Sequence, residues 1–532
     1  MVATLLWYNQ GMDKDRKIAE LEAEIARLQQ QVDWLAEQMR LAAARRFGPS
    51  SEHTQIQEQL GIFNEVEAVA DEVPPEATHV TAHARKKCGK RDELWEGIPV
   101  EQIVHDLPED ERICPDCGGA LHACGHEVLR SEVELIPAKM RKIEHVQTVY
   151  SCRHCEADAG DNTVPMVKAH VPAPVIAGSG IASPSLVSYI ICNKYALALP
   201  LYRQAQEFKR MGVTLSRQTM ANWMIYASKK WLKPIYDILH VEMLRNDILH
   251  ADETTVQVIK EDGRRASQKS YMWMYHTPKH CDKSIAIFEY QPTRQGEHPT
   301  EFLRDFKGYL HVDAYGGYKQ LEQNGVTIVE CWAHARRKFE DVIKSLKQDA
   351  KADSPANIGI AYCDKLFALE RKYDEQDLSH DERKLQREKY SRKISDEFFA
   401  WAETKARDCI PKSLMGIAVR YAVNQRHWLE NYLLDGRLEM SNNRAERSIR
   451  PFTVGRKNWL FSFTPRGANA SAVLYSIIET AYANGLIPFA YLKYLLEMLP
   501  NIDKERYAEF LPWTEAVRER CALPAPVSSV EV

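Results

Sequence analysis

The sequence predicts a multidomain α/β protein. Three observations lead to this prediction: a heptad pattern of apolar residues near the N-terminus, two Cys-x-x-Cys pairs, and three strand-like runs followed by alternating helices and strands. The chain has 532 residues, several times the length of a typical domain, so we expect three or more folding units. Its composition, 45% hydrophobic and 27% charged, is typical of an ordinary globular protein.

Composition and charge bound the compartment and the partners. No apolar run reaches the roughly 18 residues that a membrane-spanning helix needs. The N-terminus carries Leu5, Leu6 and Trp7 but no basic leader or cleavage site, so we expect a cytoplasmic protein. The net charge of -4 neither favours nor excludes nucleic acid as a partner, because a basic surface can be local and offset elsewhere.

Apolar residues near the N-terminus recur at alternating intervals of three and four. The seam consists of Ile18, Leu21, Ile25, Leu28, Val32, Leu35 and Met39. This heptad pattern favours a parallel two-stranded coiled coil over residues 13–52, which Gly48 and Pro49 help to terminate. An amphipathic helix that packs on the chain's own core is the alternative.

Residues 53–105 are predicted to be a linker with a basic cluster. Residues 64–84 are rich in Glu, Ala, Val and Pro without a helical or strand period. The cluster that follows consists of Arg85, Lys86, Lys87, Lys90 and Arg91. Such a charge run is usually a solvated surface, and contact with DNA phosphates is the sharper alternative.

Four of the 12 cysteines form two Cys-x-x-Cys pairs. The pairs are Cys114 with Cys117 and Cys152 with Cys155. Each pair can place two thiolates on one tight turn, and two such turns supply the tetrahedral four-sulfur shell that a structural Zn²⁺ ion prefers. In a reducing compartment the pattern indicates a metal site rather than disulfides. We therefore predict a zinc ribbon over residues 106–160, with His122, Cys124 and His126 as substitute ligands.

Residues 180–235 are predicted to be helical. The runs 201–210 and 216–227 form a helix pair joined by a short turn that contains Gly212. A Gly-containing turn before a polar helix start, which here includes Arg217, is typical of a helix-turn-helix that binds DNA. Because similar helix pairs are common in proteins that do not bind DNA, both interpretations stay open from the sequence.

Residues 245–465 carry the most informative order of elements. Strand-like runs at 248–258, 270–276 and 284–290 are followed by a helix near 300–306, a strand at 309–312, a helix from 315, a strand at 327–331 and a helix from 333. Three strands followed by alternating helices and strands is the ribonuclease H-like order. In that arrangement the first and fourth strands are neighbours in the sheet.

Two aspartates occupy matched places in this pattern. Asp252 lies within the first strand, and Asp313 ends the fourth. An aspartate in a strand is costly unless it is paired, exposed or bound to a metal. For either residue alone a solvent-facing or turn-capping role is the simpler interpretation, but the matched pair indicates a common site.

Phosphodiester chemistry would explain a need for several carboxylates. Two metal ions about 3.5 to 4 Å apart can activate the attacking oxygen and stabilise the leaving oxygen, and clustered carboxylates hold Mg²⁺ in this way. A third carboxylate would come from a helix beside the sheet, where Glu446 is the candidate and Pro451 is expected to end the helix. Charged helical patterns before it, at 366–372 and 381–393, predict a helical insertion at about 346–430.

The segment between Gly436 and Gly467 has seven basic and two acidic side chains, a net charge of +5. The basic residues are Arg437, Arg444, Arg447, Arg450, Arg456, Lys457 and Arg466. Phosphate binding is the natural use of such charge. Trp459, Phe461 and Phe463 are interleaved with it, and they could stack on unpaired bases or form a buried strand.

Together these residues resemble the transposases of the insertion sequence 66 family, over nearly the whole chain. The matching runs, besides the two cysteine pairs, are 46–52, 199–203, 250–254, 308–318, 331–339, 441–447 and 455–460. By resemblance, Asp252, Asp313 and Glu446 become a DDE triad that binds Mg²⁺ or Mn²⁺. The likeness also implies a leucine-zipper-like segment, a zinc-finger domain, an integrase-type core and a C-terminal helical region at 466–515.

The resemblance implies a function as well. It implies binding to the terminal inverted repeats of a bacterial insertion sequence, strand cleavage and transfer into target DNA, a homo-oligomer and accessory proteins of the same element. The residues expected to contact DNA are Arg217, Arg336, Arg337, Arg444, Arg447, Arg450, Arg456 and Lys457. His334, Arg336 and Arg337 could equally be structural. A ribonuclease H-like nuclease without strand transfer and a catalytically silent DNA-binding relative are the alternatives.

Overall fold

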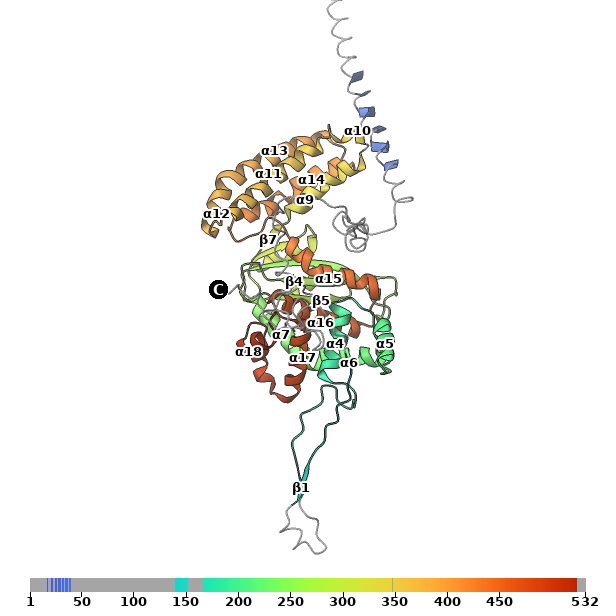
Figure 1. Ribbon diagram of the computed structural model, residues 1–532. Helices are drawn as coiled ribbons and strands as arrows, with labels where there is room; N and C mark the ends of the chain where they lie inside the picture. The colour runs from blue at the N-terminus through green and yellow to red at the C-terminus, as the bar shows by residue number, and fades with distance from the viewer. Residues whose placement is uncertain are drawn as a thin grey trace, which may run out of the picture.

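A five-stranded mixed sheet lies at the centre of the computed structural model, with helices on both sides (Figure 1). The structure describes residues 139–151, 166–346 and 348–523, together with separate positions of a helix between residues 17 and 39. None of the helices in these parts of the chain is both long and apolar enough to cross a bilayer.

The strands of this sheet were all predicted, each to within two residues at either end. They are β3 Ile248–Gln257, β4 Lys269–His276, β5 Ala286–Gln291, β6 Gly308–Val312 and β7 Val326–Glu330. Their order in space is β5-β4-β3-β6-β7. The pairs β3–β4 and β4–β5 are antiparallel, whereas β3–β6 and β6–β7 are parallel. The first predicted strand is therefore central and lies beside the fourth.

Helices alternate with the last two strands of the sheet, and the one between them is part of the crossover that their parallel pairing requires. They are α8 Glu297–Phe302 before β6, the 3₁₀ helix η4 Gly316–Asn324 before β7, and α9 Trp332–Ser345 after it. All three begin within three residues of the expected positions, so the predicted alternation of helix and strand is confirmed.

Helices from both ends of the described chain cover one side of the sheet (Figure 1). They are α4 Pro184–Tyr195, α5 Leu201–Arg210, α6 Arg217–Ala227, the π-helix η3 Ser228–Leu232, α7 Lys233–Leu244, α16 Pro465–Ala483, α17 Pro488–Met498, the 3₁₀ helices η7 Leu499–Asn501 and η8 Lys504–Phe510, and α18 Glu515–Cys521. Hydroxyls of α16 close the sheet edge, since Ser476 Oγ accepts from the Phe288 N–H at 2.8 Å and Thr480 Oγ1 accepts from the Ala286 N–H at 3.1 Å.

The other side carries a helical layer with a hydrophobic core of its own. It is built from α9, α10 Gln348–Lys351, α11 Ala356–Glu375, α12 His380–Gln386, the π-helix η5 Arg387–Ser391, α13 Arg392–Asp408, α14 Leu414–Glu430 and the 3₁₀ helix η6 Asn431–Leu433. The fully buried Arg387 pairs with Glu370 at 2.6 Å and donates to the Leu438 carbonyl at 2.8 Å. This arginine ties the layer to the segment that leads into the next helix.

Helix α15 Asn443–Trp459 continues through Pro451, so the predicted end of the helix is wrong. A proline inside a helix removes one backbone hydrogen bond and costs about 3 kcal/mol in isolation. Packing offsets this cost here, because Ile449 and Phe452 are buried and Gly455 lies against the Tyr475 hydroxyl, where a Cβ would come within 2.5 Å. Tertiary contacts therefore override the local stop signal.

Only parts of the N-terminal modules can be compared with the predictions. The described positions between residues 17 and 39 are helical, and the seam residues Leu21, Ile25, Leu28, Val32, Leu35 and Met39 are 48% to 73% exposed. Strand β1 Val149–Ser151 pairs antiparallel with β2 Met166–Lys168. The linker, the basic cluster and the candidate zinc ligands Cys114, Cys117, His122, Cys124, His126, Cys152 and Cys155 lie outside the described residues.

The start of β6 yields a first prediction. Gly308 has φ +136°, and a Cβ there would lie 2.1 Å from the Asp247 carbonyl oxygen. Gly308→Ala should destabilise the core by about 2 kcal/mol or more, because the backbone conformation and the close approach are both unfavourable for alanine. Differential scanning calorimetry should therefore show a melting temperature lower by several degrees.

Gly316→Ala is the matched control, because nothing lies within 4 Å of the Cβ that it would add. Equal melting temperatures for the two variants would contradict this account of Gly308.

Candidate active site

The parallel pairing of β3 with β6 brings the two predicted aspartates together. Ile248 lies opposite Tyr309, and His250 lies opposite His311. Asp252, still within β3, and Asp313, which directly follows β6, each lie two residues beyond the last of these pairs, and the charge of Asp313 raises the pKa of Asp252. The His250 and His311 rings stack at 4.3 Å between centroids, two residues before the respective aspartates.

Asn442 fixes the start of the helix that carries Glu446. Its Nδ2 donates to the Ala251 carbonyl at 2.8 Å, and its Oδ1 lies 3.0 Å from His250 Nδ1. Because Nδ2 already faces a carbonyl, Oδ1 must accept from an Nδ1–H of His250. Burial lowers the pKa of His250 to about 3, so the imidazole is neutral and carries its proton on Nδ1.

The backbone of this junction is bonded too. The Asn442 N–H donates to Cys331 Sγ at 3.1 Å, and the Trp332 N–H donates to the Met440 carbonyl at 3.1 Å. Glu446 lies one turn into α15, in its first turn. The helix is thus attached to the strand of Asp252 at one point and to the start of α9 at another.

The electrostatics of Asp252 reflect the gathered carboxylates. Burial raises the pKa of Asp252 well above its ordinary value, and the charges of Glu253, Asp313 and Glu446 raise it further. Three acids therefore act on one carboxyl group. A cation bound among them would relieve both the burial and the repulsion.

A fourth acid, Glu253, lies beside the triad and was not predicted. Its side chain is only 2% exposed, and it accepts from Arg294 Nε at 2.7 Å and from the Tyr318 hydroxyl at 2.5 Å. Arg294 Nη2 also lies 3.8 Å from Asp313 Oδ2, and its guanidinium covers the Tyr315 ring at 3.9 Å. The sequence hides this network because its members come from three separate segments.

Glu446 meets two basic residues of α9. Its Oε1 lies 3.4 Å from His334 Nε2, and its Oε2 lies 3.5 Å from Arg337 Nη2. These contacts do not satisfy the carboxylate fully, since the buried Oε1 has no hydrogen-bond partner among the residues that the structure describes. His334 and Arg337 therefore face a predicted metal ligand rather than open solvent.

The donor set fits Mg²⁺ or Mn²⁺. The carboxylates of Asp252, Asp313 and Glu446 are the hard oxygen ligands that these ions prefer, and Glu446 Oε1 accepts no hydrogen bond from the described residues. Within the described part of the chain, Cys331, His334 and Glu446 form a group whose potential ligand atoms all lie within 4.8 Å of one another. Cys331 is a poor ligand, because burial raises its pKa to about 11 and its sulfur already accepts from Asn442.

The basic residues expected to contact DNA fall into two groups. Arg217, Arg447, Arg450 and Lys457 are exposed. Arg336, Arg337, Arg444 and Arg456 are turned to protein partners: Arg336 Nε donates to Asp364 at 2.7 Å, Arg337 Nη2 lies 3.5 Å from Glu446, Arg444 Nε lies 3.5 Å from Glu439, and Arg456 Nη1 donates to Thr254 at 3.1 Å. The second group holds the helices to the sheet and to one another.

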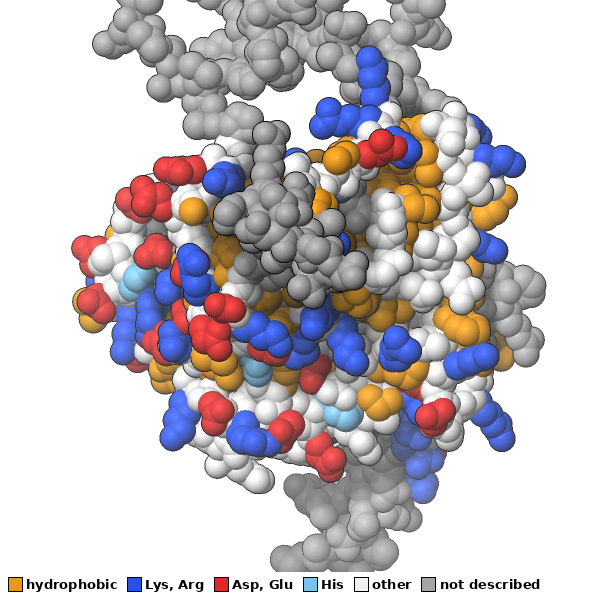
Figure 2. Space-filling model, turned by 90° about the horizontal axis from the view of Figure 1, so that it is seen from below, with side chains coloured by type: hydrophobic (Ala, Val, Ile, Leu, Met, Phe, Trp, Pro, Cys, Tyr) orange, Lys and Arg blue, Asp and Glu red, His pale blue; other side chains and the backbone are white. Residues whose placement is uncertain are grey.

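Surface charge alone does not mark a DNA path. On the face seen in Figure 2, Lys and Arg side chains form a band across the molecule with Asp and Glu side chains among them. The mixed pattern agrees with the small net charge of -4. The position of individual cations relative to the carboxylates is therefore more informative than the overall potential.

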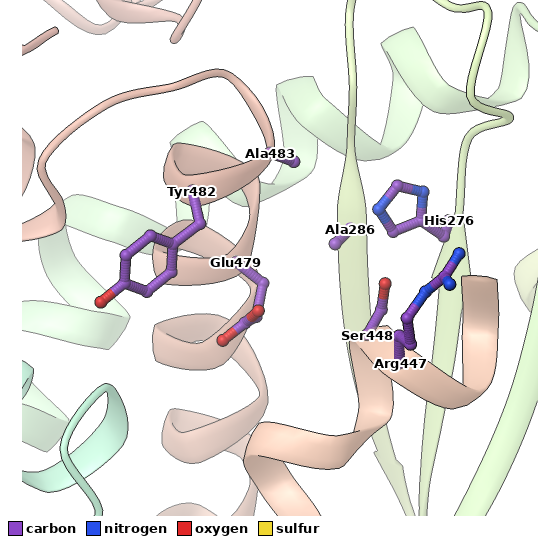
Figure 3. Close-up of a pocket in the computed structure, with 7 residues that line it drawn as sticks. All are labelled: His276, Ala286, Arg447, Ser448, Glu479, Tyr482 and Ala483. Atoms are coloured by element: carbon purple, nitrogen blue, oxygen red, sulfur yellow. The ribbon is translucent and has the colours of Figure 1, made fainter. Parts of the chain in front are cut away.

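A pocket of about 270 Å³ lies between α15 and α16 (Figure 3). It is lined by His276, Ala286, Arg447, Ser448, Glu479, Tyr482 and Ala483. Burial raises the pKa of Glu479 to about 7, and Arg447 points toward His276 across the opening. No triad member lines this pocket, so it is separate from the carboxylate site.

Comparison with known protein families identifies the class as a transposase. A family model described as "Transposase IS66 family" matches residues 179–470, more than half of the chain. The "zinc-finger binding domain of transposase IS66" matches 111–156, the "IS66 C-terminal element" matches 476–513, and "Transposase C of IS166 homeodomain" matches 34–103. The chain belongs to the IS66 transposase family, which confirms the resemblance found in the sequence.

Relatives in Sinorhizobium fredii extend over almost the whole chain. Uncharacterized protein y4hP is 30% identical over 483 residues, which cover 86% of this chain and 83% of that protein. Uncharacterized protein y4jD is 28% identical over 515 residues, and uncharacterized protein y4qI is 28% identical over 523. These two alignments each cover 94% of this chain, and 95% and 93% of the respective relative.

The role of Asn442 leads to a second prediction. Asn442→Ala would leave the His250 Nδ1–H and the Ala251 carbonyl buried without partners, at a cost of roughly 1–3 kcal/mol each. We expect a lower melting temperature and a smaller upward shift of that temperature on adding Mn²⁺, because Glu446 is no longer fixed.

The exposed neighbour Asn443 provides the control. Asn443→Ala should change both quantities little. An unchanged Mn²⁺ shift in Asn442→Ala would show that Asn442 does not hold Glu446 in place for the metal.

Proposed function

We propose that this protein binds the terminal inverted repeats of an insertion sequence and catalyses metal-dependent strand cleavage and strand transfer. Asp252, Asp313 and Glu446 are the proposed catalytic triad. The observation that carries the proposal is that the charges of Asp313 and Glu446 both act on Asp252, which lies two residues beyond the last paired residues of β3 and β6. The helix of Glu446 is bonded to the same strand through Asn442.

The proposed core is ribonuclease H-like and spans residues 245–465. Support comes from the strand order β5-β4-β3-β6-β7, with two antiparallel pairs on one side of β3 and two parallel pairs on the other. The helices from α10 to α14 would be an insertion at about 346–430. Residues 13–52, 106–160, 180–235 and 466–515 are the proposed coiled coil, zinc ribbon, DNA-binding helices and C-terminal region.

The chain's own residues would prepare the phosphodiester for attack. Asp252, Asp313 and Glu446 would hold Mg²⁺ or Mn²⁺, which when bound supplies activation of the attacking oxygen and stabilisation of the leaving oxygen. Arg337 and His334 would keep Glu446 aimed at the site, because both lie within 3.5 Å of its carboxylate. Glu253 and Arg294 would hold the Asp313 loop against β3.

Two successive reactions at phosphorus would use this one site. In the first, water attacks at the element's end, and the phosphodiester breaks to leave a free 3′ hydroxyl. In the second, that hydroxyl attacks a target phosphate and displaces another 3′ oxygen. Both are in-line displacements, so one arrangement of carboxylates can serve both steps.

DNA contacts would come from the exposed cations. Arg447, Arg450 and Lys457 lie on the helix of Glu446, and Arg217 lies at the start of α6 in the predicted helix-turn-helix. Ser216 caps α6 by accepting from the Thr219 N–H at 3.0 Å. The polar first turn of this helix is exposed and would be able to contact DNA.

Partners beyond DNA are proposed from the N-terminal modules. The exposed apolar seam would pair two identical chains as a coiled coil, since six of its positions are 48% or more exposed in one chain. A homo-oligomer could then hold both ends of the element together. Accessory proteins of the same element are further proposed partners.

Strand cleavage and joining on labelled element ends test the proposal. With Mg²⁺ or Mn²⁺ and the accessory proteins present, wild-type protein should give joined products. Asp252→Asn and Glu446→Gln should each lower the yield at least about 100-fold, because each removes a metal-binding carboxylate.

A carboxyl group outside the site controls for general effects. Glu289→Gln on β5, two strands from β3, should retain activity although its pKa is also raised, to about 7, by burial. Cleavage without joining would indicate a nuclease. DNA binding without any chemistry would indicate a catalytically silent relative.

Zinc content gives a fourth prediction, which concerns the proposed ribbon. The wild-type chain should carry about one Zn²⁺ ion, and Cys114→Ser or Cys152→Ser should remove it, because a four-sulfur shell needs all its thiolates. Mass spectrometry of the metal content is the measurement. Cys409→Ser, at a half-buried cysteine outside the ribbon, should keep the ion, and zinc retained in both ribbon variants would refute the assignment.

A further inference from the structure

The segment after α15 exposes apolar side chains in a basic setting. Leu460 is 63% exposed, Phe461 43% and Phe463 55%. The alternative prediction of a buried strand is therefore wrong for the two phenylalanines. We call Leu460, Phe461 and Phe463 the apolar tip.

Backbone hydrogen bonds hold the tip against the end of β3. The Ser462 N–H donates to the Gln257 carbonyl at 2.9 Å, and the Lys260 N–H donates to the Phe463 carbonyl at 2.9 Å. Ser462 is buried. Because side chains alternate along an extended segment, Phe461 and Phe463 face outward on the same side. The two rings are thus presented by a fixed backbone rather than by a loose loop.

Leu460 is in a conformation that a non-glycine residue rarely adopts. Its φ is +67° and its ψ is −53° at the C-terminal cap of α15. Strained residues of this kind cluster at sites of function, because the surrounding structure must impose them. Here the strain accompanies a sharp exit from the helix, after which the backbone runs along β3.

Two cations, with one apolar residue between them, lead from the carboxylate site to the tip. Arg450, Val454 and Lys457 follow Glu446 at intervals of four, four and three residues, so they lie on the same face of α15. All three are exposed. At the tip itself, Lys260 Nζ lies 4.8 Å from the centre of the Phe463 ring. A polyanion that followed these cations would reach the phenylalanines.

We propose that the apolar tip stacks on unpaired bases of the DNA whose backbone lies along α15. This inference rests on the proposed DNA-processing function and adds a second contact point to it. Leu460 lies 14 positions after Glu446 along α15 and its cap, which corresponds to about 20 Å at 1.5 Å per residue. That is the length of about six base pairs, so one duplex can reach the carboxylates and the tip together.

Binding to two synthetic probes tests the proposal without strand cleavage. One probe is a fluorescently labelled duplex about 30 base pairs long, and the other has the same sequence with about four mismatched pairs at its centre. Stacking on aromatic side chains changes affinity about 5- to 140-fold per base. Fluorescence anisotropy should therefore show wild-type protein binding the mismatched probe at least about fivefold more tightly.

Two kinds of substitution separate stacking from charge. The double variant Phe461→Ala with Phe463→Ala should lose the preference for the mismatched probe and keep its affinity for the intact duplex. Lys457→Gln should lower the affinity for both probes by the same factor, because phosphate contacts do not depend on base pairing. Tyr390→Ala, at an exposed aromatic residue of η5, should retain the preference.

Each outcome decides a different question. Equal binding of both probes by wild-type protein, or an unchanged preference in the double variant, would overturn the stacking proposal while leaving DNA binding intact. No binding of either probe would contradict the DNA-binding part of the proposed function and, with it, the stacking proposal. The double variant Phe461→Tyr with Phe463→Tyr should retain the preference, which would support stacking over a folding defect.

Discussion

The parallel contact between β3 and β6 is the constraint on which the rest of the site depends. The register is set at the first residue of β6, where Gly308 lets the strand approach Asp247 closely and the Tyr309 N–H bonds to the Asp247 carbonyl at 2.8 Å. Asp252 and Asp313 lie two residues beyond the last paired residues, His250 and His311. A one-residue slip would move one aspartate to the opposite face.

Much of the sheet and its acidic residues could be predicted because their signals are local. Strand-like runs marked each strand, and each aspartate stood at a recognisable place in its pattern. Asn442 and Glu253 could not be found in this way. Asn442 bonds to His250, 192 residues earlier, and Glu253 depends on Arg294 and Tyr318 from other segments. Such contacts exist only after the chain has packed.

Helix α15 shows where a local rule yields to packing. Pro451 would end an isolated helix, yet burial of its neighbours Ile449 and Phe452 keeps the helix intact. The exposure of Phe461 and Phe463 has the same origin, since backbone pairing with β3 fixes which way the segment faces. In both cases the sequence carried the relevant residues, but distant parts of the chain decided their environment.

Side chains bind backbone groups at both edges of the sheet, which restricts how copies of this chain can assemble. On β5 the hydroxyls of Ser476 and Thr480 take the outward N–H groups, and on β7 the Asn431 amide donates to the Ile328 carbonyl at 2.7 Å. A strand from a second molecule would have to displace these side chains before it could add to the sheet. Association of folded chains by β-augmentation is therefore disfavoured at these positions.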